Sequence, residues 1–127
     1  MRLLLDTVTF IWALQSPERL SKRAVATIGS EDENSLEVSS ISLSEIAIKH
    51  NQGKLQLSEV ESADGLVDLQ ARVLPYATPH ALRLFKLPLH HSDPFDRMLI
   101  AQALAEDIPV ITSDEKFRLY KGLKVIW

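Results

Sequence analysis

The chain has 127 residues, 46% hydrophobic and 24% charged, a balance that excludes a disordered polyelectrolyte and fits one globular domain over residues 1–127. It has no cysteine, which excludes a disulfide framework and any thiolate metal site and is compatible with a reducing compartment. The formal charge of −3 lacks the basic excess of a protein that holds duplex DNA by charge alone, although acids gathered around cations would also make this count negative.

We expect neither a secretory signal nor a membrane span in the N-terminal segment. Asp6 interrupts the apolar run that begins at Leu3, so no long apolar region of a signal peptide is present. The longest stretch without a charged residue, Thr7–Pro17, has 11 residues. A membrane-spanning helix needs about 20. We therefore expect a cytoplasmic protein without a membrane segment.

Five short apolar runs have the length and composition of β-strands. Each has three or four residues that include Leu, Val or Ile: Leu3–Leu5, Leu36–Val38, Arg72–Leu74, Pro109–Thr112 and Lys124–Ile126. Segments with helical spacing of apolar residues lie between them. Because parallel strands need helical crossovers that cover both faces of a sheet, this alternation predicts an α/β fold with a central parallel sheet of four to five strands.

The clearest helix is predicted over Pro94–Glu106. Its residues are mostly good helix formers, and proline suits the first helical position. Its apolar content predicts that the helix is largely buried. Three glycines, Gly53, Gly65 and Gly122, are expected to mark turns.

Four acids stand where helices are predicted to begin. They follow the first strand, the second strand, the start of the Pro94 helix and the fourth strand: Asp6, Glu45, Asp96 and Asp114. The spacing from Ser42 to Glu45 matches a capping box, and the spacing from Asp93 to Asp96 resembles one. Taken singly, each acid is therefore best explained as a helix cap.

Taken together, the same acids indicate a metal site. Ligands of an open parallel sheet bind outside the carboxyl ends of its strands, and a first strand that ends in Asp6 normally lies at this central crevice. Two carboxylates about 5 Å apart repel by roughly 3 kcal/mol at an effective dielectric constant of 20, and a bound cation removes this conflict. Oxygen ligands favour Mg²⁺ or Mn²⁺, whereas Zn²⁺ prefers His or Cys.

The chain resembles a known family over its whole length. The segments that carry the resemblance to PIN-domain proteins of the VapC toxin type are Leu4-Leu5-Asp6-Thr7, Ser44-Glu45-Ile46-Ala47-Ile48-Lys49, Gly53-Lys54-Leu55, His91 to Ala103 and Ile111-Thr112-Ser113-Asp114. The most specific of them is Asp93–Ala103. The resemblance implies a three-layer α/β/α domain and a metal-dependent endoribonuclease, the toxin of a toxin–antitoxin pair, which a cognate antitoxin holds inactive.

The resemblance also assigns roles and partners. Asp6, Glu45 and Asp96 match the three principal acidic positions of the family, and Asp114 matches the fourth, more variable one. Together they would be the catalytic residues and would hold one or two Mg²⁺ or Mn²⁺ ions, with RNA as substrate. A homodimer and an antitoxin partner are implied in the same way.

Two positions depart from the family pattern. Val8 stands where the family often has His, and Ser44 stands where it often has Trp, directly before Glu45. Neither position supplies a metal oxygen, so the departures leave the acidic set intact and bear on substrate contacts and packing.

Other polar side chains carry weaker signals. Thr7 and Ser113 lie beside two of the acids and either orient them or serve as helix-start hydroxyls. Arg97 is expected to form a structural ion pair rather than to touch substrate. Adjacent His90 and His91 do not favour a zinc site, and a phosphate contact by His91 is the better of its functional interpretations. Four cations either line a path for RNA or belong to a solvated surface: Lys49, Lys54, Arg83 and Lys86.

Three other functions compete with a ribonuclease. The first is a catalytically weak PIN scaffold that acts as a protein-binding module. The second is a DNA nuclease with the same metal chemistry, since carboxylates around a metal do not distinguish sugars. The third, a phospho-accepting receiver domain, needs an acidic pair near the first strand, whereas Asp6 stands alone.

Overall fold

Five parallel strands form the centre of the molecule. The computed structural model describes residues 1–127, and its strands lie in the spatial order β3-β2-β1-β4-β5. Their bounds are β1 (Arg2–Leu5), β2 (Ser35–Ser39), β3 (Arg72–Leu74), β4 (Val110–Ile111) and β5 (Val125–Ile126). All four neighbouring pairs are parallel. The predicted strands and the parallel α/β sheet are thus confirmed.

The central strand β1 is buried on both faces. Leu3, Leu4 and Leu5 are all 0% exposed. Successive strand residues point to opposite faces, so Leu4 joins one apolar cluster while Leu3 and Leu5 join the other. A run of three leucines without polar alternation therefore predicts a strand covered on both sides, as observed.

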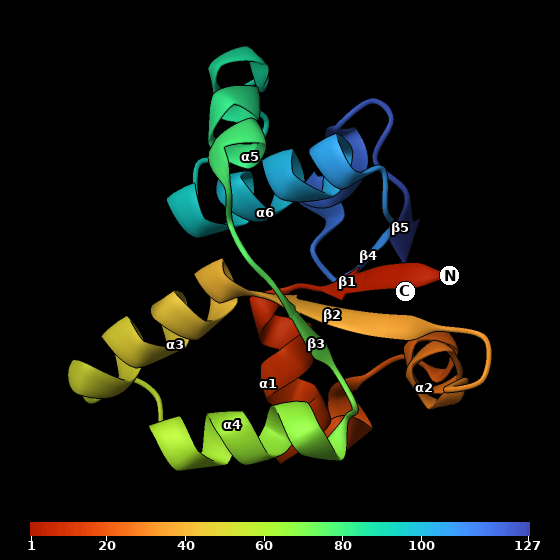
Figure 1. Ribbon diagram of the computed structural model, residues 1–127, viewed down its shortest axis with the longest axis vertical. Coiled ribbons are helices and arrows are strands. Elements are labelled where there is room, and N and C mark those ends of the chain that lie inside the picture. Colours follow the sequence, from red (N-terminus) through yellow and green to blue (C-terminus); the bar gives the residue numbers. More distant parts are fainter.

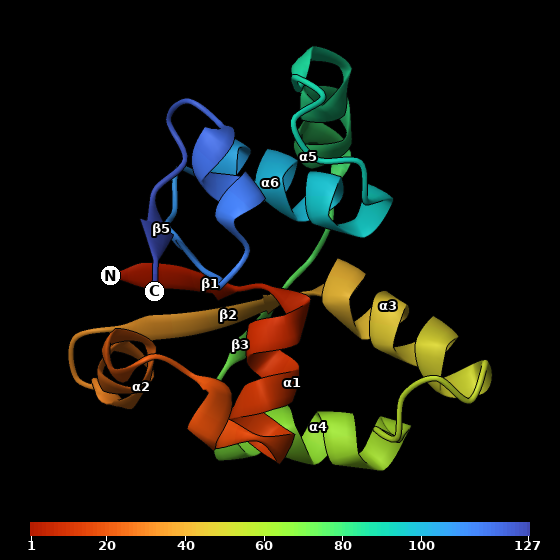
Figure 2. The ribbon, with the colours of Figure 1, turned by 180° about the vertical axis from the view of Figure 1, so that it is seen from behind.

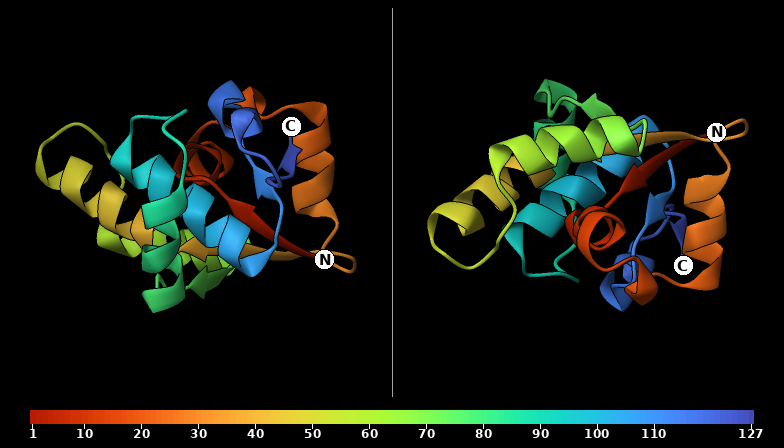
Figure 3. Two further views of the ribbon diagram at one scale, coloured as in Figure 1. Left: turned by 90° about the horizontal axis from the view of Figure 1, so that it is seen from above. Right: turned by 90° about the horizontal axis from the view of Figure 1, so that it is seen from below.

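Helices cover each face of the sheet and produce three layers (Figures 1 and 2). On one side lie α1 (Thr7–Gln15), α2 (Lys22–Gly29) and α4 (Glu59–Asp68), and on the other lie α5 (Thr78–Arg83) and α6 (Pro94–Glu106). Figure 3 shows these two layers from their outer sides.

Helix α3 (Ser40–Asn51) follows β2 directly and contacts both α1 and α6. Three short 3₁₀ helices, η1 (Pro17–Arg19), η2 (Leu84–Lys86) and η3 (Glu115–Leu119), complete the chain.

Helix α6 has the predicted bounds. The side chain of Asp93 accepts hydrogen bonds from the backbone N–H groups of Phe95 and Asp96, and Pro94 occupies the first helical position. The helix ends at Asp107, which adopts a left-handed conformation with φ of 54°. Residues 99–103 are buried, so the prediction of a largely buried helix is also confirmed.

Two local predictions are wrong. Helix α3 begins at Ser40 and is capped by Ser39, whose hydroxyl accepts from Ile41 N–H, so Ser42 and Glu45 form no capping box. Gly65 marks no turn but lies inside α4, where a side chain would collide with Leu14. No helix of the chain is both long enough and apolar enough to cross a membrane.

Candidate metal centre

The carboxyl edge of the sheet gathers residues that are far apart in the sequence. In the parallel register Leu5 of β1 lies between Val38 of β2 and Ile111 of β4, so the chain leaves all three strands at the same edge. Asp6 directly follows β1, and Asp114 lies three residues after β4. Helix α3, which carries Glu45, and helix α6, which carries Asp96, are in contact.

Asp6 is both a helix cap and part of a buried polar network. It is 3% exposed, and its Oδ1 accepts from Thr9 N–H at 2.9 Å as the N-cap of α1. Its Oδ2 accepts from the hydroxyl of Thr112 at 2.6 Å. Burial raises the pKa of Asp6, and the nearby charge of Asp114 adds to this effect. The cap explanation and a role in a site are therefore compatible.

Glu45 presents an unsatisfied oxygen. The residue lies in the second turn of α3 and is 6% exposed. Its Oε2 accepts from Lys49 Nζ at 2.5 Å, whereas its Oε1 is buried and has no hydrogen-bond partner in the protein. A buried carboxylate oxygen without a partner is unfavourable, so this atom is available to a ligand.

Asp96 is surrounded by other acids. Burial raises its pKa to about 7, and the negative charges of Asp93 and Asp6 act in the same direction. Glu45 adds a smaller contribution, while His91 lowers this pKa. Asp93, Asp6 and Glu45 therefore all act electrostatically on Asp96, as carboxylates at a cation site do.

A histidine joins Asp96 to the fourth acid. His91 Nε2 lies 3.1 Å from Asp96 Oδ2 and 2.8 Å from Asp114 Oδ2. Ligand-type atoms of these three residues all lie within 4.8 Å of one another. The imidazole is buried, whereas the neighbouring His90 is exposed and packs edge-on against Tyr120. The two histidines thus do not act together, but His91 lies closer to the acids than its sequence signal indicated.

A threonine that the sequence analysis did not single out connects two of the acids. Thr112 is 1% exposed, donates to Asp6, and accepts from the backbone N–H of Asp114 at 3.0 Å. The two residues for which an orienting role is one of two alternatives, Thr7 and Ser113, do not contact the acids in this way. Thr7 donates to Ser42 at 2.8 Å, and Ser113 makes no hydrogen bond to any of the acids. The Thr-x-Asp spacing directly after a strand was the available signal.

The basic side chains near the edge are few. Lys49 pairs with Glu45, and this contact is the main cause that raises the Lys49 pKa. The predicted ion pair of Arg97 is wrong, because its guanidinium instead donates to backbone carbonyl oxygens of residues 87, 88 and 91. Three other candidates make no ion pair: Lys54, Arg83 and Lys86.

Both departures from the family pattern, Val8 and Ser44, are exposed.

The donor set of this edge fits a hard divalent cation. Carboxylate oxygens predominate, one buried oxygen has no partner, and Asp96 is held near like charges. Mg²⁺ and Mn²⁺ prefer such oxygen ligands. An acidic cluster suited to a metal is therefore present.

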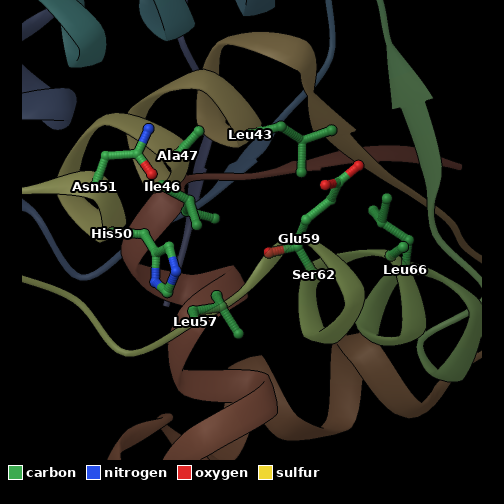
Figure 4. Close-up of a pocket in the computed structure, with 10 residues that line it drawn as sticks. Leu43, Ile46, Ala47, His50, Asn51, Leu57, Glu59, Ser62 and Leu66 are labelled. Atoms are coloured by element: carbon green, nitrogen blue, oxygen red, sulfur yellow. The ribbon is translucent and has the colours of Figure 1, made fainter.

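An apolar groove lies elsewhere, between α3 and α4. Its volume is about 380 Å³, and side chains of the two helices face each other across it (Figure 4). Most of its lining is apolar, including Leu43, Ile46, Leu57 and Leu66, and none of the four predicted site acids borders it. The groove is thus separate from the acidic edge.

Comparisons with known proteins identify relatives by family and fold. The family model described as PIN domain matches residues 3–123. No curated protein matches the chain in sequence. Among solved structures, a chain of VapBC2 from Rickettsia felis, bound to a DNA fragment from its promoter, is similar with a TM-score of 0.74 and 16% identity, over 98% of this chain and 97% of that one.

Two further structures have the same fold. A chain of FitAcB from Neisseria gonorrhoeae gives a TM-score of 0.63 and 21% identity, over 97% of this chain and 95% of that one. A chain of VapBC-5 from Mycobacterium tuberculosis gives a TM-score of 0.61 and 18% identity, over 98% of this chain and 96% of that one. The three-layer fold is thus shared along nearly the whole length of these chains.

Proposed function

Because this chain belongs to the PIN-domain family, we propose that it is a metal-dependent endoribonuclease, the toxin of a toxin–antitoxin pair. PIN domains are generally nucleases, and the similar structures include chains of VapBC complexes. The observation that carries the proposal is the buried, unpartnered Oε1 of Glu45 at the edge where the Asp96 pKa is raised by neighbouring acids.

In this proposal four residues hold Mg²⁺ or Mn²⁺ and are the catalytic residues: Asp6, Glu45, Asp96 and Asp114. A bound divalent ion would supply an activated water and stabilise charge at the scissile phosphate. Asp6 is fixed for this role by the Thr9 N–H and the Thr112 hydroxyl. Lys49 holds one oxygen of Glu45 and leaves the other oxygen free to bind.

Cleavage of a defined RNA by the purified protein tests this proposal. We expect products with a 5′-phosphate and a 3′-hydroxyl, formed only with added Mg²⁺ or Mn²⁺ and abolished by a chelator. A DNA strand of the same base sequence serves as the alternative substrate. DNA cleavage in place of RNA cleavage would contradict the ribonuclease and favour the DNA nuclease.

The second candidate is a catalytically weak scaffold that binds a protein. The apolar groove between α3 and α4 favours it, since exposed apolar grooves mark interaction sites. A toxin would also need a protein contact with its antitoxin, so the groove does not decide between the two candidates. A folded protein that binds Mn²⁺ at the acidic edge but cleaves neither RNA nor DNA would favour the scaffold.

We also propose a homodimer that acts in the cytoplasm. Three exposed apolar side chains on and after α5 support association: Leu82 (58% exposed), Phe85 (88%) and Leu89 (78%). Sedimentation of the wild type and of Phe85→Glu tests this point. A dimer that becomes a monomer in the variant is expected, and a monomeric wild type would contradict it.

A further inference from the structure

His91 is held in place by contacts to its backbone. The guanidinium of Arg97 donates to the carbonyl oxygens of Leu87 at 3.2 Å, Pro88 at 2.9 Å and His91 at 3.3 Å. The backbone N–H of His91 donates to the hydroxyl of Tyr120 at 2.8 Å. The segment before α6 is therefore fixed by two buried or half-buried side chains. Arg97, expected from the sequence to form an ion pair, is used here to fix the path of the chain.

The ring of His91 is oriented as well. Its Nδ1 accepts from the backbone N–H of Asp93 at 3.2 Å. Neutral imidazole has one acceptor and one donor nitrogen, so the proton lies on Nε2. The ring also packs edge-on against Phe117, with centroids 5.8 Å apart and planes at 84°. The ring therefore donates a hydrogen bond through Nε2–H and not through Nδ1.

That donor meets two carboxylates from different parts of the chain. Asp96 lies in the first turn of α6, and Asp114 caps η3. Nε2–H donates to Asp114 Oδ2 at 2.8 Å, and the same nitrogen lies 3.1 Å from Asp96 Oδ2. Two like charges repel each other, so a partly positive N–H between the two carboxylates favours their close approach. The second oxygen of each carboxylate is not engaged by His91.

We propose that His91 is a positioning residue of the acidic site, whose Nε2–H donates to Asp114, lies against Asp96 and remains a donor, not a ligand, when a divalent cation binds. This inference rests on the proposed metal-dependent function. Direct ligation would require an unprotonated Nε2 and would move the proton to Nδ1, where it would face the N–H of Asp93. The hydrogen bond to Asp114 and the contact with Asp93 therefore both oppose ligation.

Nuclear magnetic resonance of the wild-type protein with ¹⁵N-labelled histidine tests the tautomer directly. We expect one histidine to show a protonated Nε2 and an unprotonated Nδ1, and His91→Gln identifies the signal by its loss. Titration with Mg²⁺ should leave this tautomer unchanged. A proton on Nδ1, or loss of the Nε2 proton on addition of Mg²⁺, would overturn the proposal.

Calorimetry with Mn²⁺ measures the effect on the site. Removal of a residue that orients a metal ligand typically costs 10- to 100-fold in affinity, so we expect a loss of about this size in His91→Ala. His91→Gln retains an amide N–H near the position of Nε2 and should recover part of the loss. His90→Ala is the matched control, because the exposed His90 makes no contact with the acids, and its affinity should stay within about twofold.

The outcomes separate this inference from the proposed function. If the wild type binds Mn²⁺ and His91→Ala binds it equally well, the positioning role is wrong while the nuclease proposal stands. Failure of the wild type to bind Mn²⁺ would overturn both. Equal losses in His91→Ala and His91→Gln, with both proteins folded by circular dichroism, would contradict a role that depends on the donated proton.

Discussion

The two ends of helix α6 carry acids in opposite electrostatic settings. Glu106, the last residue of the helix, accepts from His80 Nε2 at 3.0 Å and from Arg2 at 3.0 Å, and these contacts lower its pKa. Asp96, in its first turn, meets His91 and other acids, and its pKa rises to about 7. The same helix therefore separates compensated acids from uncompensated ones.

Two buried acids of the chain differ in the same way. Glu37, in the middle of β2, is 5% exposed and has both oxygens bound by Arg2, at 2.6 and 2.9 Å. Glu45, at the carboxyl edge, is similarly buried but keeps one oxygen without a partner. Both carboxylate oxygens of Glu37, which has only a structural role, thus have hydrogen-bond partners in the protein. Glu45 at the proposed site keeps one carboxylate oxygen free to bind a ligand.

The largest expected effect separates the two acids of α6 by activity. Asp96→Asn should reduce metal-dependent RNA cleavage by more than about 100-fold, because it removes a proposed ligand. Glu106→Gln, the matched change at the other end of the helix, should leave the rate within about twofold. Equal losses in both variants, measured on folded protein with Mg²⁺, would remove the distinction between the two edges.

The next effect concerns stability at the amino edge. Arg2→Ala leaves the buried carboxylate of Glu37 without its cation and should lower the free energy of unfolding by about 1 to 2 kcal/mol, since Arg2 itself is partly exposed. Arg118→Ala removes an exposed pair with Glu115 and should cost less than about 0.5 kcal/mol. Urea denaturation measures both. A smaller loss for Arg2→Ala than for Arg118→Ala would contradict the structural role of this edge.

The pH dependence of stability should reveal the uncompensated acid. The folded pKa of Asp96 lies above its ordinary value of 3.8, so the native state binds more protons and its stability falls between about pH 4 and 7. In metal-free protein, Asp96→Asn should therefore be more stable than wild type at pH 8, by about 1 to 2 kcal/mol after allowance for partial exposure. Urea denaturation at pH 4 and pH 8 measures this difference in the free energy of unfolding. If the advantage of Asp96→Asn over wild type were no larger at pH 8 than at pH 4, the predicted sign would be contradicted.

The smallest effect, at Glu106, has the opposite sign. Its folded pKa lies below the ordinary value of 4.5, so its contribution to stability is present above that pH and is lost as the pH falls. Glu106→Gln should therefore be destabilised at pH 7, by about 0.5 kcal/mol, with a smaller deficit near pH 3. Thermal unfolding of both proteins at pH 7 and pH 3 checks this. A loss of stability in Glu106→Gln that is larger at pH 3 than at pH 7 would contradict the prediction.

Most of the fold could be predicted because its signals are local. Three consecutive leucines before Asp6 indicated a strand buried on both faces, and Asp93-Pro94 indicated the start of α6. The sequence misplaces the start of α3, because several serines compete for the cap and the end of β2 decides among them. The turn predicted at Gly65 is wrong, because the close approach of this glycine to Leu14 depends on the packing of α1 against α4.

The site could be predicted less completely, because several of its contacts depend on the tertiary structure. The acids could be named because a parallel sheet sends its strand ends to one edge. The contacts of Thr112, His91 and Arg97 depend on side-chain directions in space, and residue spacing does not encode these directions. Tertiary contacts therefore gave Arg97 backbone partners in place of the predicted carboxylate.

Anomalous diffraction from crystals soaked in Mn²⁺ is the most direct test of a cation site at the carboxyl edge. We expect a peak about 2 Å from carboxylate oxygens, including Oε1 of Glu45 and an oxygen of Asp96, and no peak beside Glu37 or Glu106. A protein that shows no peak among Asp6, Glu45 and Asp96 at saturating Mn²⁺ would contradict the proposed metal site.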